Sequence, residues 1–215
     1  MLREINLSEV SDGKLYESND MAKTDCQGCA GCSDCCRGMG NSVILDPFDV
    51  FRLSLHFSKN FEELLADFLE LNVADGIILP NLRMTGPDES CIFLDQAGRC
   101  TVHGARPGLC RLFPLGRYYE NGSFRYFLQV HECPKQNKTK IKIKKWLDTE
   151  NLRQYEKFIT DWHYYLRERQ ETAMQAEDAA TVKILSMDIL RRFYLPPYEK
   201  NADFYTPFYE RMNMK

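Results

Sequence analysis

The chain has 215 residues, of which 44% are hydrophobic and 27% charged, and its formal net charge is −3. These values are typical of a globular protein with one or two domains. The negative balance argues against a general nucleic-acid binder, and no segment approaches the roughly 18 apolar residues of a membrane span or the apolar run of a secretory signal. Neither nucleic acid nor a membrane is therefore an expected partner.

The first third of the sequence predicts a lead-in, a cysteine-rich segment and two helices. Residues 1–25 carry six acidic and three basic side chains without a clear pattern. A helix is predicted from Asp46 to about Phe57, because Asp is a good N-cap and Pro47 suits the first helical position. The spacing of Phe and Leu residues predicts a second helix over 61–71.

The middle of the sequence changes to β-prone runs. Three strands are predicted, at 76–84, 91–94 and 99–102. A short helical turn between prolines is predicted within 106–114. The Asn121-Gly122 pair lies between two further β-prone runs, 117–119 and 124–130, which is a strong hairpin signal.

The last third predicts an exposed strand followed by helices. Residues 135–145 hold six lysines and no acid, and the alternation at 140–144 favours a solvated edge strand over an anion-binding patch. Apolar residues at helical spacing predict a long helix from about Asp148 through Leu166 and another over 176–194. The aromatic tail at 204–209 is expected to pack back on the body.

Together these patterns predict an α+β fold, with a small, irregular, cysteine-rich body that is organised by metal, carries short strands and is flanked by helices. Three regions are predicted: the N-terminal lead-in at 1–25, a cysteine-cluster metal-binding domain at 26–135, and a C-terminal helical region at 136–215 packed on that domain. All nine cysteines precede the second boundary.

Cysteine content points to metal chemistry. Nine cysteines cannot all pair within one chain, and without a secretory signal the expected compartment is the reducing cytoplasm. In such a compartment, dense cysteines bind metal or act in catalysis more often than they form disulfides. Thiolates suit zinc and iron–sulfur clusters equally well.

Five of these cysteines lie within residues 26–36, and two ligand registers compete there. Cys26, Cys29, Cys32 and Cys36 fit the C-x2-C-x2-C-x3-C run of bacterial ferredoxins, although arginine replaces the proline that follows that run. Cys29, Cys32, Cys35 and Cys36 form the alternative, C-x-x-C-x-x-C-C. A second set follows along the chain: Cys91, Cys100, Cys110 and Cys133.

These cysteines and their neighbours resemble the YkgJ-type cysteine-cluster family of zinc- or iron-chelating proteins. The resemblance covers about residues 26–134 and rests on Cys29-Ala-Gly-Cys-Ser-Asp-Cys-Cys-Arg, Val43-Ile-Leu, Cys91-Ile-Phe-Leu, Gly98-Arg-Cys-Thr-Val-His and Ala105-Arg-Pro-Gly-Leu-Cys-Arg-Leu-Phe-Pro. It implies that up to eight cysteines bind the metal or cofactor: Cys29, Cys32, Cys35, Cys36, Cys91, Cys100, Cys110 and Cys133. Cys26 is additional to this pattern.

The predicted cofactor is an iron–sulfur cluster, with a 4Fe–4S cluster favoured and zinc as the alternative. The clustering is similar to ferredoxin loops, and the adjacent Cys35 and Cys36 suit one zinc tetrahedron poorly. The motif is also similar to part of the flagellin lysine N-methylases, which implies methyl transfer. The family resemblance itself implies no single reaction.

The predicted function is therefore a cytoplasmic metal-binding protein whose cluster serves redox or a modification reaction. A zinc-stapled interaction module and a metal carrier, both without catalysis, are the alternatives. No paired carboxylates, serine–histidine pattern or phosphate loop stands out, so catalytic residues, the partner protein or small molecule, and whether the chain is an enzyme all stay unknown.

Several cationic residues near the cysteines are secondary candidates. Arg37, Arg106 and Arg111 can balance thiolate charge or hold a substrate anion, although surface ion pairs are as common a role. His103 and His131 are candidate ligands or proton carriers, although such histidines are more often supporting or exposed residues. The sequence predicts no chemistry for His163.

Overall fold

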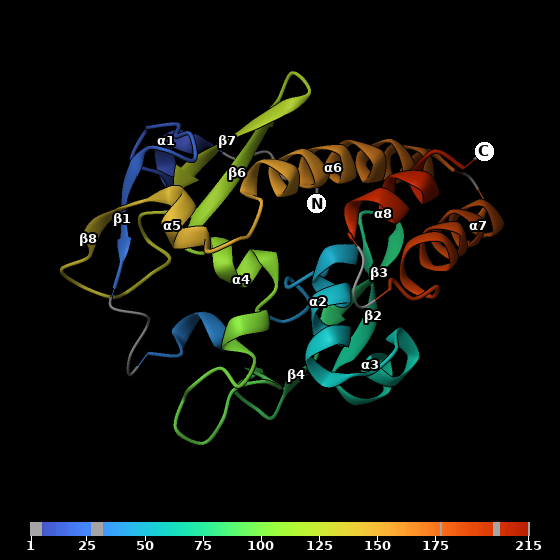
Figure 1. Ribbon diagram of the computed structural model, residues 1–215, viewed down its shortest axis with the longest axis horizontal. Helices are drawn as coiled ribbons and strands as arrows, with labels where there is room; N and C mark the ends of the chain where they lie inside the picture. Colours follow the sequence, from blue (N-terminus) through green and yellow to red (C-terminus); the bar gives the residue numbers. More distant parts are fainter. Residues whose placement is uncertain (1–5, 27–31, 177, 200–202, 215) are drawn as a thin grey trace.

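The computed structural model of the protein describes residues 6–26, 32–176, 178–199 and 203–214 and has the predicted α+β fold (Figure 1). Its α-helices are α1 (Leu7–Val10), α2 (Pro47–Phe57), α3 (Phe61–Asp67), α4 (Gly108–Leu112), α5 (Ile143–Leu147), α6 (Leu152–Gln175), α7 (Ala179–Ile189) and α8 (Tyr205–Met212). Two 3-10 turns, η1 (Asp34–Cys36) and η2 (His103–Ala105), and a π-helical turn, η3 (Leu190–Tyr194), complete the helical elements.

Within the described residues, the strands form four two-stranded antiparallel sheets. They are β1 (Met21–Asp25), β2 (Leu69–Ala74), β3 (Ile77–Leu82), β4 (Met84–Thr85), β5 (Ser90–Cys91), β6 (Leu115–Glu120), β7 (Ser123–Leu128) and β8 (Thr139–Lys142). The pairs are β1 with β8, β2 with β3, β4 with β5, and β6 with β7. Three of the four pairs are local along the chain, whereas β1 and β8 lie on either side of residues 26–134 and pair with each other.

Two elements with clear local signals are confirmed. The Asp46 carboxylate accepts the Asp49 N–H at 2.8 Å and the Asp49 carboxylate accepts the Asp46 N–H at 3.3 Å, which forms a capping box at the start of α2. The hairpin predicted around Asn121-Gly122 is β6–β7, and both turn residues have positive φ.

One predicted helix is too long. The helix predicted over 61–71 ends at Asp67, and Leu69 begins β2 instead. Leu69 is fully buried, and β2 pairs with β3 around a turn in which Asp75 and Gly76 both have positive φ. This Asp-Gly turn is a hairpin signal that the helical spacing of the leucines obscures.

Other predicted boundaries also shift. The strands predicted at 91–94 and 99–102 are largely turns, because β5 ends at Cys91 and an isolated bridge joins Leu94 to Cys100. The acidic lead-in contains β1. The long C-terminal helix begins at Leu152 rather than near Asp148, since Asp148 and Asn151 adopt positive φ before it.

The main hydrophobic core includes residues of α2, α3, β2, β3, α6, α7 and α8. The aromatic stripe predicted on the long helix belongs to this core, with Phe158 0% and Trp162 4% exposed. The aromatic tail packs back as predicted, through Phe204, Tyr205 and the fully buried Phe208. A smaller core lies beneath the β6–β7 hairpin, β1 and α5.

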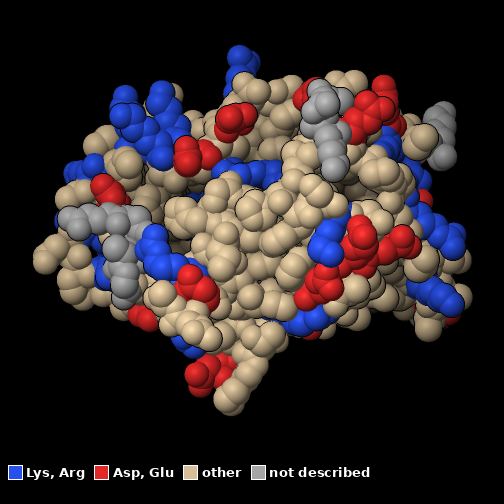
Figure 2. Space-filling model, turned by 60° about the horizontal axis from the view of Figure 1, so that its bottom comes forward, with Lys and Arg blue, Asp and Glu red and all other residues tan. Residues whose placement is uncertain are grey.

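Charge is unevenly distributed over the face shown in Figure 2, whose centre is broadly uncharged. The lysine-rich run ends in β8 and α5, where Lys140, Lys142, Lys144 and Lys145 are exposed, as expected for a solvated edge.

Among the residues described, no helix has both the length and the apolar character needed to cross a membrane.

Candidate metal centre

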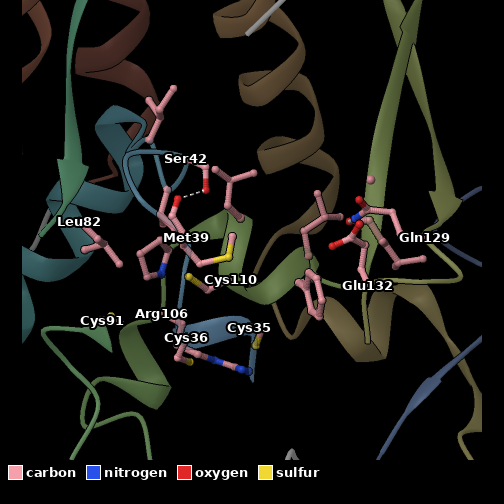
Figure 3. A pocket seen from close by; sticks show the side chains of 18 of the residues that line it. Cys35, Cys36, Met39, Ser42, Leu82, Cys91, Arg106, Cys110, Gln129 and Glu132 are labelled. Atoms are coloured by element: carbon pink, nitrogen blue, oxygen red, sulfur yellow. Dashed lines mark hydrogen bonds between the residues drawn. The ribbon is translucent and has the colours of Figure 1, made fainter. Parts of the chain in front are cut away.

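Four separate segments bring cysteines to one cavity, and Figure 3 labels those of three of these segments: Cys35 and Cys36, Cys91, and Cys110. Cys35 and Cys36 form the end of η1, Cys91 ends β5, and Cys110 lies within α4. Cys100 follows the tight turn that begins at Asp95, where the Asp95 carboxylate accepts the Arg99 N–H at 2.8 Å. Short, turn-bounded elements therefore present thiols that are up to 75 residues apart in sequence, from Cys35 to Cys110.

The thiols of Cys36, Cys91, Cys100 and Cys110 act on one another electrostatically. Burial raises the pKa of the Cys91 thiol to about 11, with further increases from the charge of Cys36 and Cys100. Burial also raises the pKa of Cys100 and Cys110, and Cys110 is affected by all three of the other thiols. These four sulfurs form a group in which negative charge on one disfavours negative charge on the next.

Cys36 is the most acidic thiol of this group. A hydrogen bond from the Cys35 side chain, together with the positive charges of Arg106 and Arg37, lowers the pKa of Cys36 to about 7 despite partial burial. Arg37 is held in place by hydrogen bonds to Ser90 at 2.6 Å and Ser33 at 3.4 Å. Of these four thiols, Cys36 therefore most readily becomes a thiolate, the form that binds metal.

The remaining predicted ligands have different positions. Cys32 and Cys35 line the same cavity as the four interacting thiols. Cys133 is absent from the described lining, and its carbonyl accepts a hydrogen bond from Lys138 Nζ at 3.0 Å. Cys26 is also absent from that lining. Cys29 lies outside the described residues.

The donor set fits a thiophilic metal by its chemistry. Sulfur ligands suit zinc or iron rather than calcium or magnesium, which prefer oxygen. Within the described ranges, no group of three or more His, Cys, Asp or Glu side chains forms a complete metal site. Six of the eight described thiols line one cavity, and ligation would draw them closer together.

The histidines and arginines that were secondary candidates lie in different places relative to the cavity. His103 and Arg106 line the cavity, whereas His131 is absent from the described lining. Arg111 is buried, and it donates to the Asp148 carbonyl at 2.8 Å and to Thr149 Oγ1 at 2.6 Å. Arg111 therefore ties α4 to the loop before α6.

Asp49, which the sequence analysis overlooks, anchors the helix that carries Cys110. Its carboxylate accepts the Gly108 N–H at 2.7 Å, and Asp49 is 2% exposed. Gly108 approaches so closely that a Cβ there would clash with the Tyr155 hydroxyl. The capping pattern of α2 marks Asp49 as an N3 residue, but its partner 59 residues away has no local signal.

Asp46 and Asp49 form a buried carboxyl pair behind this anchor. Burial raises the pKa of both groups, and the charge of Asp49 raises that of Asp46 further. Since the folded pKa lies above the ordinary value, the pair stabilises the fold most below about pH 3.9, and this contribution declines as pH rises through the folded pKa.

We therefore expect Asp46→Asn to gain stability relative to the wild type as pH rises from about 4 to 7. The gain follows because Asn does not ionise. For one group, the difference in unfolding free energy between the two proteins changes by at most about 1.4 kcal/mol per pH unit. Urea unfolding of both proteins at several pH values measures it. A constant difference in unfolding free energy across this range would contradict the raised pKa of Asp46.

The cysteines open onto a cavity of about 650 Å³. Figure 3 shows Cys35, Cys36, Cys91, Cys110 and Arg106 at one side of it and Gln129 and Glu132 at the other. A closed structural metal site has no need of such a space, whereas a reactive centre needs access for a second molecule.

This fold and these converging thiols define a cysteine-based metal-binding protein. Residues 26–140 match the family model CxxCxxCC, described as a putative zinc- or iron-chelating domain, so the chain belongs to this family. No curated protein and no solved structure matches the chain.

Proposed function

We propose that the protein holds an iron–sulfur cluster through the C-x-x-C-x-x-C-C motif and downstream cysteines, and uses it for redox or a modification reaction in the cytoplasm. The observation that carries this proposal is the group Cys36, Cys91, Cys100 and Cys110. These four thiols line one cavity. Burial, and then charge on another member of the group, raises the pKa of each of the last three, so a multivalent cation at their centre would relieve the repulsion.

Two features support iron–sulfur over zinc. Cys35 and Cys36 are adjacent in sequence and both line the cavity, an arrangement that suits one zinc tetrahedron poorly. In all, six described cysteines line it, more than the four ligands of either one zinc ion or one 4Fe–4S cluster: Cys32, Cys35, Cys36, Cys91, Cys100 and Cys110. Arg106 and Arg37 lie close enough to act on Cys36, and positive charge near the sulfurs is one means by which proteins tune cluster potential. Such a cluster would supply one-electron chemistry, and this chain would supply ligands, charge balance and access.

Zinc remains the alternative, because the same sulfur donors bind it equally well and the four thiols come from separate segments that one ion would staple together. In that case the protein would be an interaction module or a metal carrier. The cavity beside the thiols favours a reactive metal centre over a purely structural zinc ion.

Anaerobic purification distinguishes the two. We expect brown protein with iron and acid-labile sulfide in comparable amounts per chain. Metal analysis, sulfide assay and the visible absorption spectrum measure this directly. Colourless protein with about one zinc per chain, and without sulfide, would reject the iron–sulfur proposal and favour the zinc alternative.

A further inference from the structure

The cavity beside the cysteines has a second, chemically different end. It extends from the thiols to Arg117 and Tyr119 of β6 and to His163 and Arg167 of α6. Between the two ends the wall is largely apolar, formed by Val43, Leu79, Leu82, Phe93, Leu115 and Phe127. We call this whole space the chamber.

Positive charge dominates the chamber although the chain is acidic overall. Its lining holds four arginines, Arg99, Arg106, Arg117 and Arg167, and a single carboxylate, Glu132. Arg99 and Arg106 act on the cysteines, because both lower the pKa of Cys100. Arg117 and Arg167 belong to the opposite end. Arg167 is exposed and pairs with Glu171 at 2.8 Å, so Arg117 is the arginine of that end without an ion pair among the described residues.

Arg117 has the environment of an unused anion-binding group. Its Nη2 donates to the Tyr155 hydroxyl at 3.1 Å, and its Cζ lies 5.7 Å from the ring centres of both Phe124 and Tyr155. Its Nε is buried without a hydrogen-bond partner. Among the described residues no carboxylate forms an ion pair with it, and the buried Asp46 acts on it only through its charge. A buried guanidinium with a spare donor beside a cavity is costly unless a ligand completes its bonding.

The neighbouring aromatic rings provide a flat wall. His163 stacks on Tyr119 with ring centres 3.6 Å apart and planes 5° from parallel. Burial lowers the pKa of His163 to about 4, so this ring is neutral at pH 7. The role of His163 is thus to shape the chamber, which the sequence alone does not indicate.

We propose that the chamber binds a small organic carboxylate, with its acid group on Arg117 and its apolar or aromatic body extending toward the cysteines. The fork of a guanidinium matches the two oxygens of a carboxylate. A phosphate dianion would need more donors than one buried arginine with tyrosine hydroxyls supplies, and it would suit these apolar walls poorly. A volume of about 650 Å³ lies in the usual range for small-molecule sites.

This proposal has two parts. The first part is that the acid binds, and it follows from the chamber itself. The second part is that the body of the acid meets a reactive centre. It rests on the function proposed above, since only a bound metal or cluster would make the cysteine end reactive. Ligand binding and metal content therefore need separate measurements on the same protein.

Matched pairs of probes test the binding. The probes are arylalkanoates from benzoate to 6-phenylhexanoate, each compared with its neutral primary amide by calorimetric titration of the full chain. We expect at least one acid to bind about 10- to 100-fold more tightly than its amide, the range for a hydrogen bond to a charged group. Equal binding within every pair, or no binding up to 10 mM, roughly the weakest affinity of a small-ligand site, would overturn the proposal.

Substitutions locate the acid group. Arg117→Gln is expected to bring the acid's affinity to that of the amide, while Arg117→Lys keeps part of the preference. Arg125→Gln is the matched control, because Arg125 is an exposed residue of the same hairpin that pairs with Glu120 and is absent from the described lining. A folded Arg117→Gln protein that keeps the full preference would overturn the assignment.

A second variant covers the case in which Arg117→Gln fails to fold. Leu166→Trp narrows the chamber from the α6 side and is expected to abolish binding of acid and amide alike. Undiminished acid binding in that variant would place the ligand elsewhere and overturn the proposal. Iron, zinc and sulfide are measured on the same samples, so acid preference in metal-free protein would support this inference even if the iron–sulfur proposal failed.

Discussion

Replacing Cys110 by alanine is expected to remove most of the metal-dependent stability of this protein. Cys110 lines the same cavity as Cys36, Cys91 and Cys100, and charge on each of these adds to the burial that raises its pKa. Structural metal contributes about 10 kcal/mol or more in small thiolate domains, as much as the whole stability of many proteins. Losing even about 3 kcal/mol would lower Tm by roughly 6–12 °C in a chain of this size.

The measurement compares melting of metal-loaded and chelator-treated protein for each variant. In the wild type the loaded form should melt well above the treated form, and in Cys110→Ala the two should nearly coincide. Cys26→Ala is the matched control, because Cys26 is additional to the family pattern and absent from the described cavity lining. A full metal-dependent rise in Cys110→Ala would show that this thiol is not a ligand.

Elements with their own capping and turn signals could be predicted from the sequence. Asp46 and Pro47 define the start of α2, and Asn121-Gly122 defines the β6–β7 turn. In both cases the deciding hydrogen bonds join residues only a few positions apart. Local chemistry was therefore sufficient.

Prediction was wrong where tertiary burial outweighed local spacing. The leucines of 61–71 fit a helix, but Leu69 is buried in a strand that pairs with Leu82. The partner of β1 is β8, more than 100 residues away, and nothing in the acidic lead-in indicates that pairing. Helical periodicity cannot separate a short buried strand from the end of a helix.

The candidate site also has a part that the sequence indicates and a part that only the fold shows. Sequence spacing identifies the cysteines as a set, but only the fold shows which thiols interact, because their four segments meet through tertiary contacts. The far end of the chamber has no sequence signal. Arg117 lies in an ordinary strand, and His163 is one of several aromatic residues on a helix.

Gly108→Ala is expected to destabilise the protein by about 1–3 kcal/mol, the usual cost of forcing an extra group into a packed site. A Cβ at Gly108 would clash with the Tyr155 hydroxyl and lie 3.5 Å from Asp49 Oδ1. Because Gly108 begins α4, relieving this clash would also displace Cys110. Metal content per chain should therefore fall together with Tm.

Gly104→Ala is a close control, since a Cβ there would meet no atom within 4 Å. Tyr155→Phe tests the cause directly, because it removes the hydroxyl with which the new methyl group clashes. In a double-mutant cycle measured by urea unfolding, Gly108→Ala should cost less in the Tyr155→Phe background than in the wild type. Additive effects would mean that the hydroxyl is not the obstacle. A restored metal content in the double variant would further tie the position of α4 to the ability of Cys110 to bind metal, because no thiol is changed in either protein.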